Sequence, residues 1–132
     1  MIFLDSSYIK ATILKNDPYA DQSRSMEPYL EHETKVTNIT VLLEVFNSVN
    51  HYNFFGDVNE LRKSLVGMNV FDYLTSDDYS DAFELFKYFD WTINFADCTI
   101  LQSMFKHGIQ RIASFDSDFD KIKGIERIYG FF

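Results

Sequence analysis

Short hydrophobic runs alternate with longer stretches of helical periodicity along this chain. The run Met1–Leu4 is stopped by Asp5, which predicts a strand that is buried on both faces. Further strands are expected at 36–37, 70–74, 111–115 and 126–129. Apolar residues at spacings of three and four predict helices at about 8–14, 19–33, 38–52, 57–66, 77–90 and 95–107, with a short helix at 118–122. Asn38 and Asn94 are typical N-caps, and Gly108 suits the C′ position of the helix before it.

Strands that alternate with helices favour parallel pairing through right-handed crossovers. We therefore expect an α/β fold, a three-layer α/β/α sandwich with a mostly parallel central sheet. Ligands of such folds bind beyond the carboxyl ends of the strands. Polar residues that directly follow a strand are accordingly the first candidates for chemistry.

Composition narrows the class of protein. With 132 residues, 46% of them hydrophobic, the chain is too apolar to be disordered and is expected to form a single domain over 1–132. Neither a leader nor a membrane-spanning run is evident, and Cys98 is the single cysteine, so a cytoplasmic protein without disulfides is expected. The net charge of −8 argues against bulk attraction to nucleic acid. Any action on a phosphate backbone would need added positive charge.

Two aspartates follow predicted strands directly. Asp5 comes after Met1–Leu4, and Asp116 comes after the strand at 111–115. Each alone could be a turn or cap residue. Because the carboxyl ends of parallel strands converge at one edge of a sheet, the two together favour a functional site.

Asp97 stands out by its place on a helix. At 100° per residue it falls within the apolar face that contains Ile100 and Met104, where an unpaired charge is costly. The opposite arc holds Thr99, Gln102, Ser103 and Lys106. Alternatively, Asp97 is a first-turn residue three positions after Asn94, where a carboxylate suits the helix dipole and a capping box.

Other candidate residues are weaker by pattern alone. Glu44 shares a helix sector with Thr40 and Asn47, which periodicity assigns to a solvated face. Asp118 fits an N-cap of the short helix, although it could reach a metal, and Asp120 is expected to face solvent. The sequence shows no zinc-type spacing of histidine and cysteine, no glycine-rich phosphate loop and no nucleophile elbow. The aromatic residues of 52–55 and 79–89 are expected in the core, and any that are exposed would indicate a subunit interface.

Four segments resemble a known family in their order and spacing. MIFLDSSYI, ITVLLEVFNS, INFADCTILQSMFKHG and IASFDSDFDKI are together similar to PIN domains, small metal-dependent ribonucleases that include VapC-type toxins of toxin–antitoxin pairs. The resemblance covers nearly the whole chain. It implies that the catalytic and metal-binding residues are Asp5, Glu44, Asp97 and Asp116. Ser6 and Ser114 take the family's hydroxyl positions, whereas the aromatic segment between Glu44 and Asp97 departs from the pattern.

The resemblance implies an endoribonuclease that depends on Mg²⁺ or Mn²⁺, the ions that oxygen ligands without histidine or thiolate select. Such an ion would activate a water molecule and neutralise the leaving oxygen. The implied partners are an RNA substrate, an antitoxin protein and a second copy in a homodimer, without a membrane. The lysines and arginines that could grip RNA are Lys10, Lys15, Arg24 and Lys121. Two alternatives stay open: an inactive PIN-like module that binds RNA or protein, and, with less weight, a phosphoacceptor domain.

Overall fold

The computed structural model describes residues 1–130, so the last two residues of the expected domain lie outside the described part. Within it, the strands are β1 (Ile2–Leu4), β2 (Lys35–Asn38), β3 (Val70–Asp72), β4 (Arg111–Ala113) and β5 (Glu126–Ile128). The helices are α1 (Ser6–Ile13), α2 (Ala20–Leu30), α3 (Ile39–Ser48), α4 (Val58–Val66), α5 (Ser76–Tyr88) and α6 (Phe95–Lys106), with a 3₁₀ helix η1 (Ser117–Lys121). Every predicted element is present, and most bounds differ by only a few residues.

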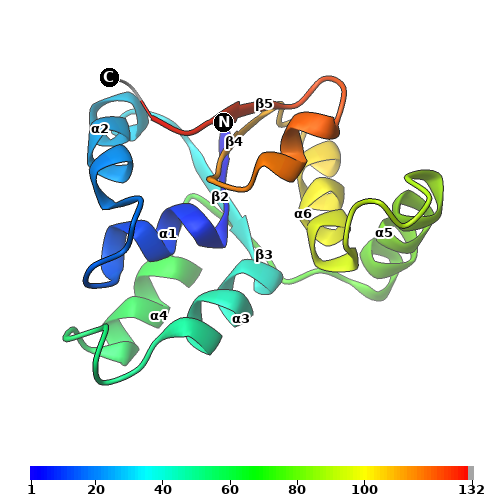
Figure 1. Cartoon of the computed structure of the whole chain (residues 1–132). Coiled ribbons are helices and arrows are strands. Elements are labelled where there is room, and N and C mark those ends of the chain that lie inside the picture. The colour runs from blue at the N-terminus through cyan, green and yellow to red at the C-terminus, as the bar shows by residue number, and fades with distance from the viewer. Residues whose placement is uncertain (131–132) are drawn as a thin grey trace.

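The five strands described form one parallel sheet in the order β3-β2-β1-β4-β5. In Figure 1, α1, α2 and α4 lie on one side of this sheet and α5 and α6 lie on the other. α3 follows β2 and contacts both α1 and α6 near the carboxyl ends of the strands. The predicted α/β sandwich is thus confirmed, and the order of the strands places β1 and β4 side by side.

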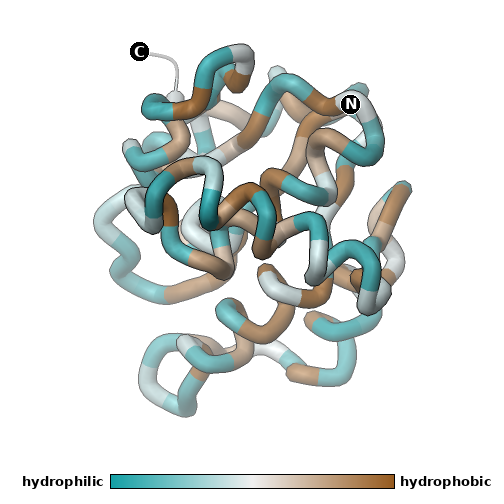
Figure 2. Tube along the Cα trace, turned by 90° about the vertical axis from the view of Figure 1, so that its right-hand side faces the viewer, coloured by the Kyte–Doolittle hydropathy of each residue, from teal (hydrophilic) through white to brown (hydrophobic). Residues whose placement is uncertain are grey.

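The short apolar runs are buried and form the core of the sheet. Ile2, Phe3, Val36 and Ile112 of the sheet are fully buried. Figure 2 shows hydrophobic positions recurring among hydrophilic ones along the helices, as expected for helices that cover a sheet with one face. Among the described residues, no helix has both the length and the apolar character needed to cross a membrane.

Helix α3 ends at Ser48, four residues before the predicted end at Tyr52. The Asn50 side chain accepts hydrogen bonds from the N–H groups of Tyr52 and Asn53, and the Asn53 side chain accepts one from the Asn50 N–H. These bonds satisfy backbone groups locally, so they compete with continuation of the helix. The prediction of helix through Tyr52 is therefore wrong.

Helix α6 is buried on more than its apolar face. Thr99 and Ser103, which periodicity places opposite that face, are both buried. The Asn38 amide at the end of β2 donates to the Thr99 carbonyl at 3.3 Å and to the Ser103 hydroxyl at 3.0 Å. The Thr99 hydroxyl lies 2.6 Å from that of Thr40. This polar contact fixes α6 against the start of α3.

Candidate metal centre

Asp5 lies at the carboxyl end of β1 and is the N-cap of α1. Its Oδ1 accepts the Ser6 N–H at 2.8 Å, and its Oδ2 accepts the hydroxyls of Ser114 at 2.6 Å and Ser7 at 3.1 Å. The residue is 4% exposed, and this burial raises the pKa of its carboxyl group, against the effect of the Ser114 hydrogen bond. Asp5 is therefore both a cap and a tightly oriented carboxylate.

Asp116 lies three residues beyond the end of β4 at Ala113, because β4 is shorter than the strand predicted at 111–115. Its own N–H donates to Ser114 Oγ at 3.0 Å, so one hydroxyl group contacts the residues that follow two neighbouring strands. Its carboxylate accepts the Asp118 N–H at 2.9 Å, which makes Asp116 the N-cap of η1. The expectation that Asp118 caps this helix is therefore wrong. Asp118 instead lies in the first turn, and its carboxylate joins those of Asp97 and Asp116 in a group whose nearest oxygens all lie within 4.8 Å of one another.

Asp97 projects from the first turn of α6, whose N-cap is Asn94. Its N–H donates to the Asn94 side chain at 2.8 Å, and its carboxylate is 6% exposed. Burial raises the pKa of this carboxyl group to about 7, and the charges of Asp5, Asp116, Glu44 and Asp118 add to the effect in that order. Asp97 thus belongs to the acidic group at the strand ends as well as to the start of its helix.

Glu44 is half-buried, so the solvated face that periodicity indicated for it is wrong. Its Oε2 accepts the Ser6 hydroxyl at 3.1 Å, which brings α3 against the start of α1. Burial raises the pKa of its carboxyl group, and the charge of Asp5 raises it further. Helical periodicity did not predict the burial of Glu44, because the helix that contacts it, α1, is distant in the sequence.

The carboxylate group fits a hard divalent cation. Within residues 1–130, Glu44 Oε1 and Asp97 Oδ2 are buried oxygens that have no hydrogen-bond partner. A buried acceptor without a partner is costly, and several close carboxylates repel one another. Carboxylate oxygens are the donors that Mg²⁺ and Mn²⁺ prefer. The geometry groups Asp97, Asp116 and Asp118 as residues that could hold an ion, and Asp5 and Glu44 are near enough for their charges to act on Asp97.

The basic residues singled out in the sequence differ in their surroundings. Lys10 lies near Glu44, and its charge lowers the pKa of that carboxyl group against the larger effect of burial. Lys121 forms an ion pair with Asp118 at 2.9 Å, and Arg24 forms one with Asp21. Lys15 lies over the Phe55 ring, 5.1 Å from its centroid. Lys10 and Lys121 are thus the two residues of this set whose charges act on the carboxylates of the candidate centre.

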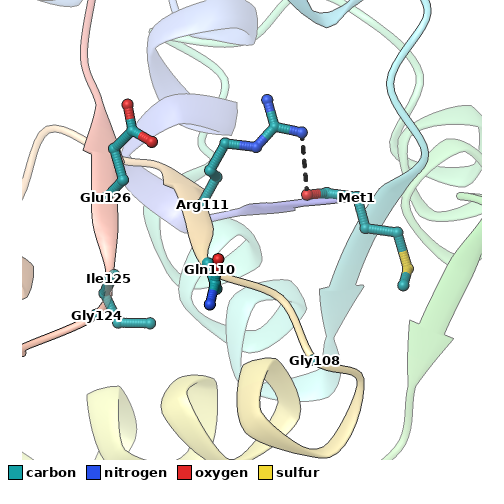
Figure 3. A pocket seen from close by; sticks show the side chains of 7 residues that line it. All are labelled: Met1, Gly108, Gln110, Arg111, Gly124, Ile125 and Glu126. Carbon is teal, nitrogen blue, oxygen red and sulfur yellow. Dashed lines mark hydrogen bonds between the residues drawn. The ribbon is translucent and has the colours of Figure 1, made fainter.

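A separate pocket lies at the other end of the strands, away from the carboxylate group. Figure 3 shows it at the amino ends of β4 and β5, beside Met1, with Arg111 and Glu126 among its lining residues. Arg111 donates to the Met1 carbonyl at 3.4 Å and pairs with Glu33 at 2.7 Å. Because neither the three clustered carboxylates nor Asp5 and Glu44 line this pocket, it is distinct from the candidate centre.

Comparison with known proteins agrees with the arrangement of these elements. The family model of the PIN domain matches residues 2–125. Among solved structures, VapC20 of Mycobacterium tuberculosis, described as a sarcin-ricin loop cleaving toxin, matches with a TM-score of 0.77 and 23% identity, over 92% of this chain and 94% of that one. FitAcB from Neisseria gonorrhoeae matches with a TM-score of 0.60 and 17% identity, over 89% and 88% of the two chains. The comparison with curated proteins gave no match. The chain belongs to the PIN domain family, as its four sequence segments predicted.

Proposed function

We propose that this protein is a metal-dependent endoribonuclease that hydrolyses RNA phosphodiester bonds, and that it is the toxin of a toxin–antitoxin pair. The observation that carries the proposal is the buried, unpartnered Asp97 Oδ2 within the group of Asp97, Asp116 and Asp118, beside a second buried carboxylate, Glu44, whose Oε1 also lacks a partner. An ion held by Asp97, Asp116 and Asp118 would satisfy Asp97 Oδ2 and offset the local negative charge, which includes that of Glu44. Membership of the PIN family and the similarity to a toxin that cleaves an RNA loop support the same reaction.

In this proposal Asp5, Glu44, Asp97 and Asp116 are the catalytic and metal-binding residues. Mg²⁺ or Mn²⁺, when bound, supplies a Lewis acid that lowers the pKa of a water molecule and stabilises charge on the phosphate. The chain itself orients the ligands. Ser114 and Ser7 fix Asp5 Oδ2, and Ser6 holds Glu44 Oε2.

Binding of the ion requires these carboxyl groups to lose their protons. Burial and mutual repulsion raise the pKa of Asp97 to about 7, so a proton held on its carboxylate must leave before or as the ion enters. The hydroxyl groups around Asp5 favour its charged form. The site is therefore arranged so that ion binding and proton release are coupled.

A protein partner is also part of the proposal. Phe83, Trp91 and Phe95 are exposed aromatic residues at the junction of α5 and α6, and the prediction that Phe83 lies in the core is wrong. Exposed aromatic groups of this kind are typical of protein interfaces. We assign this face to self-association as a homodimer, and an antitoxin is the second expected partner.

The test is RNA cleavage by the purified protein with Mn²⁺ or Mg²⁺, beside a chelated sample. Asp97→Asn should abolish metal-dependent cleavage. Asp77→Asn, which changes an exposed aspartate in the first turn of α5, should leave it intact. RNA binding that is equal in both variants, without cleavage by the unmodified chain, would favour the alternative of an inactive binding module.

A further inference from the structure

Three aromatic rings lead from the core to the surface beside the carboxylate group. Tyr8 of α1 is buried, and its ring centroid lies 6.4 Å from that of Phe115. Phe115 is half-buried and stacks on Tyr19, with 4.6 Å between ring centroids and 3° between ring planes. Tyr19 remains 42% exposed. The series of rings therefore ends at a residue whose ring is covered on one face by Phe115 and is still accessible to solvent.

The backbone of both residues in the stacked pair, Tyr19 and Phe115, is held in place by hydrogen bonds. The Tyr19 N–H donates to Asp17 Oδ1 at 2.9 Å, and the Ala20 N–H donates to the Asp17 carbonyl at 3.1 Å. The Phe115 N–H donates to Ser7 Oγ at 2.9 Å. An aromatic side chain that is already fixed loses little conformational freedom when a ligand stacks on it. The pair is therefore preorganised for stacking.

The same contacts place the pair next to the metal centre. Ser7 Oγ, which receives the Phe115 N–H, donates to Asp5 Oδ2. Phe115 also directly precedes Asp116 in the chain. A group that stacks on Tyr19 would accordingly lie close to a phosphate at the carboxylates.

The charges around the carboxylate group favour the approach of a polyanion from the side of Tyr19 and Phe115. Helix α5, across the sheet, carries Asp77, Asp78, Asp81 and Glu84 against Lys87. On the side of the aromatic pair, α1 and the residues after it carry Lys10 and Lys15 against Asp17, and Asp21 near Tyr19 is paired with Arg24. Electrostatic attraction therefore guides a nucleic-acid backbone over α1 rather than over α5.

We infer that Tyr19, backed by Phe115, binds an unpaired nucleobase of the RNA by stacking, beside the phosphate that is cleaved. This inference rests on the proposed ribonuclease function, whose substrate it restricts to RNA with an unstacked base at the cleavage site. Stacking on an aromatic ring accepts any base, so the pair contributes affinity and position more than sequence preference.

The test uses an RNA pool with random flanks and one central 2-aminopurine, whose fluorescence falls when it stacks on a ring. Binding to the full chain without added metal should quench the signal. Tyr19→Leu should weaken RNA binding by about 10-fold and remove most of the quenching, whereas Tyr19→Phe should preserve both. The matched control is Tyr52→Leu, a tyrosine that is 90% exposed, and circular dichroism checks the fold of each variant.

Cleavage of the same pool with Mn²⁺ separates this inference from the proposed function. If the unmodified chain cleaves RNA and Tyr19→Leu binds and quenches equally well, the stacking role is overturned and the ribonuclease stands. Quenching that depends on Tyr19 without any cleavage would support base binding and overturn the ribonuclease. Neither quenching nor cleavage by the unmodified chain would overturn both.

Discussion

The Ser114 hydroxyl donates a 2.6 Å hydrogen bond to Asp5 Oδ2, although the two residues lie 109 positions apart in the sequence. Pairing of β1 with β4 causes this contact, because residues that follow adjacent parallel strands emerge at the same edge of the sheet. The hydrogen bond favours the charged form of Asp5 against the effect of burial, which raises the pKa of that carboxyl group. In the proposed function, Ser114 thus favours the charged form of Asp5 that would bind a cation.

Ser114→Ala should therefore weaken Mn²⁺ binding at neutral pH. Loss of a hydrogen bond to a metal ligand typically lowers metal affinity by about 10-fold or more. Isothermal titration with Mn²⁺ measures this effect. Ser117→Ala is the matched control, since Ser117 is an exposed hydroxyl residue in the same segment. Equal affinities for the two variants would contradict a supporting role for Ser114.

Asp97 should make the stability of the metal-free protein depend on pH. Burial, then neighbouring charges, raise its pKa from 3.8 to about 7. A carboxyl group with a raised pKa in the folded state stabilises the fold while it is protonated. Its contribution is fully present below the ordinary pKa and is lost as pH rises through about 7. Urea unfolding in chelator should therefore show a free energy of unfolding that decreases between about pH 4 and 7.

The asparagine variant isolates the cause of this pH dependence. Asp97→Asn lacks the titrating group, so its free energy of unfolding should depend less on pH over the same interval. Asp77→Asn should keep the slope of the unmodified chain. Addition of Mn²⁺ should raise the melting temperature of the chain with Asp97 and of the Asp77→Asn control, but not that of Asp97→Asn. Identical pH slopes in all three proteins would exclude Asp97 as the source.

Lys106 supports the fold at a distance from the candidate centre. Its Nζ contacts Asp72 at 3.0 Å and Asp78 at 3.1 Å, at the opposite end of α6 from Asp97. The Thr75 N–H lowers the pKa of Asp78 to about 2, with a smaller contribution from Lys106. Lys106→Ala leaves both carboxylates without this cation and should lower the free energy of unfolding at pH 7 by about 1–3 kcal/mol.

Urea unfolding beside Lys87→Ala tests this role of Lys106. Lys87 pairs with Glu84 on the exposed side of α5 and should contribute less than about 1 kcal/mol. Mn²⁺ affinity should be unchanged in both variants. A loss of stability no larger for Lys106→Ala than for Lys87→Ala would show that the two-carboxylate contact contributes little.

The parts of the fold that depend on local patterning could be predicted from the sequence. Short apolar runs gave the strands, and helical periodicity with Asn38 and Asn94 as caps gave two helix starts that the structure confirms. Asp5 could be selected by position alone because it directly follows β1, and Asp116 because it lies in the short connection between β4 and η1. The sequence was sufficient to predict a feature wherever a single helix or strand determines that feature.

Features that depend on two distant elements were not visible in the sequence. Glu44 is half-buried because Ser6 of α1 contacts it, and helical periodicity reports only a single helix. The stack of Tyr19 on Phe115 likewise joins a loop before α2 to the end of β4. Thr99 and Ser103 are buried because Asn38 approaches α6 from the sheet. Each case required tertiary contacts that no local pattern encodes.

Asp118 and Asp120 offer the sharpest test of which carboxylates hold the ion. Both lie in η1, but Asp118 joins the group of Asp97 and Asp116, whereas Asp120 is exposed and pairs with Arg127. Asp118→Asn removes one negative oxygen ligand and should weaken Mn²⁺ binding by about 10-fold. Asp120→Asn removes the same charge from the same short helix and should leave Mn²⁺ affinity unchanged. Because the two variants have the same net charge, a general electrostatic effect would weaken both equally, and that result would exclude Asp118 from the centre.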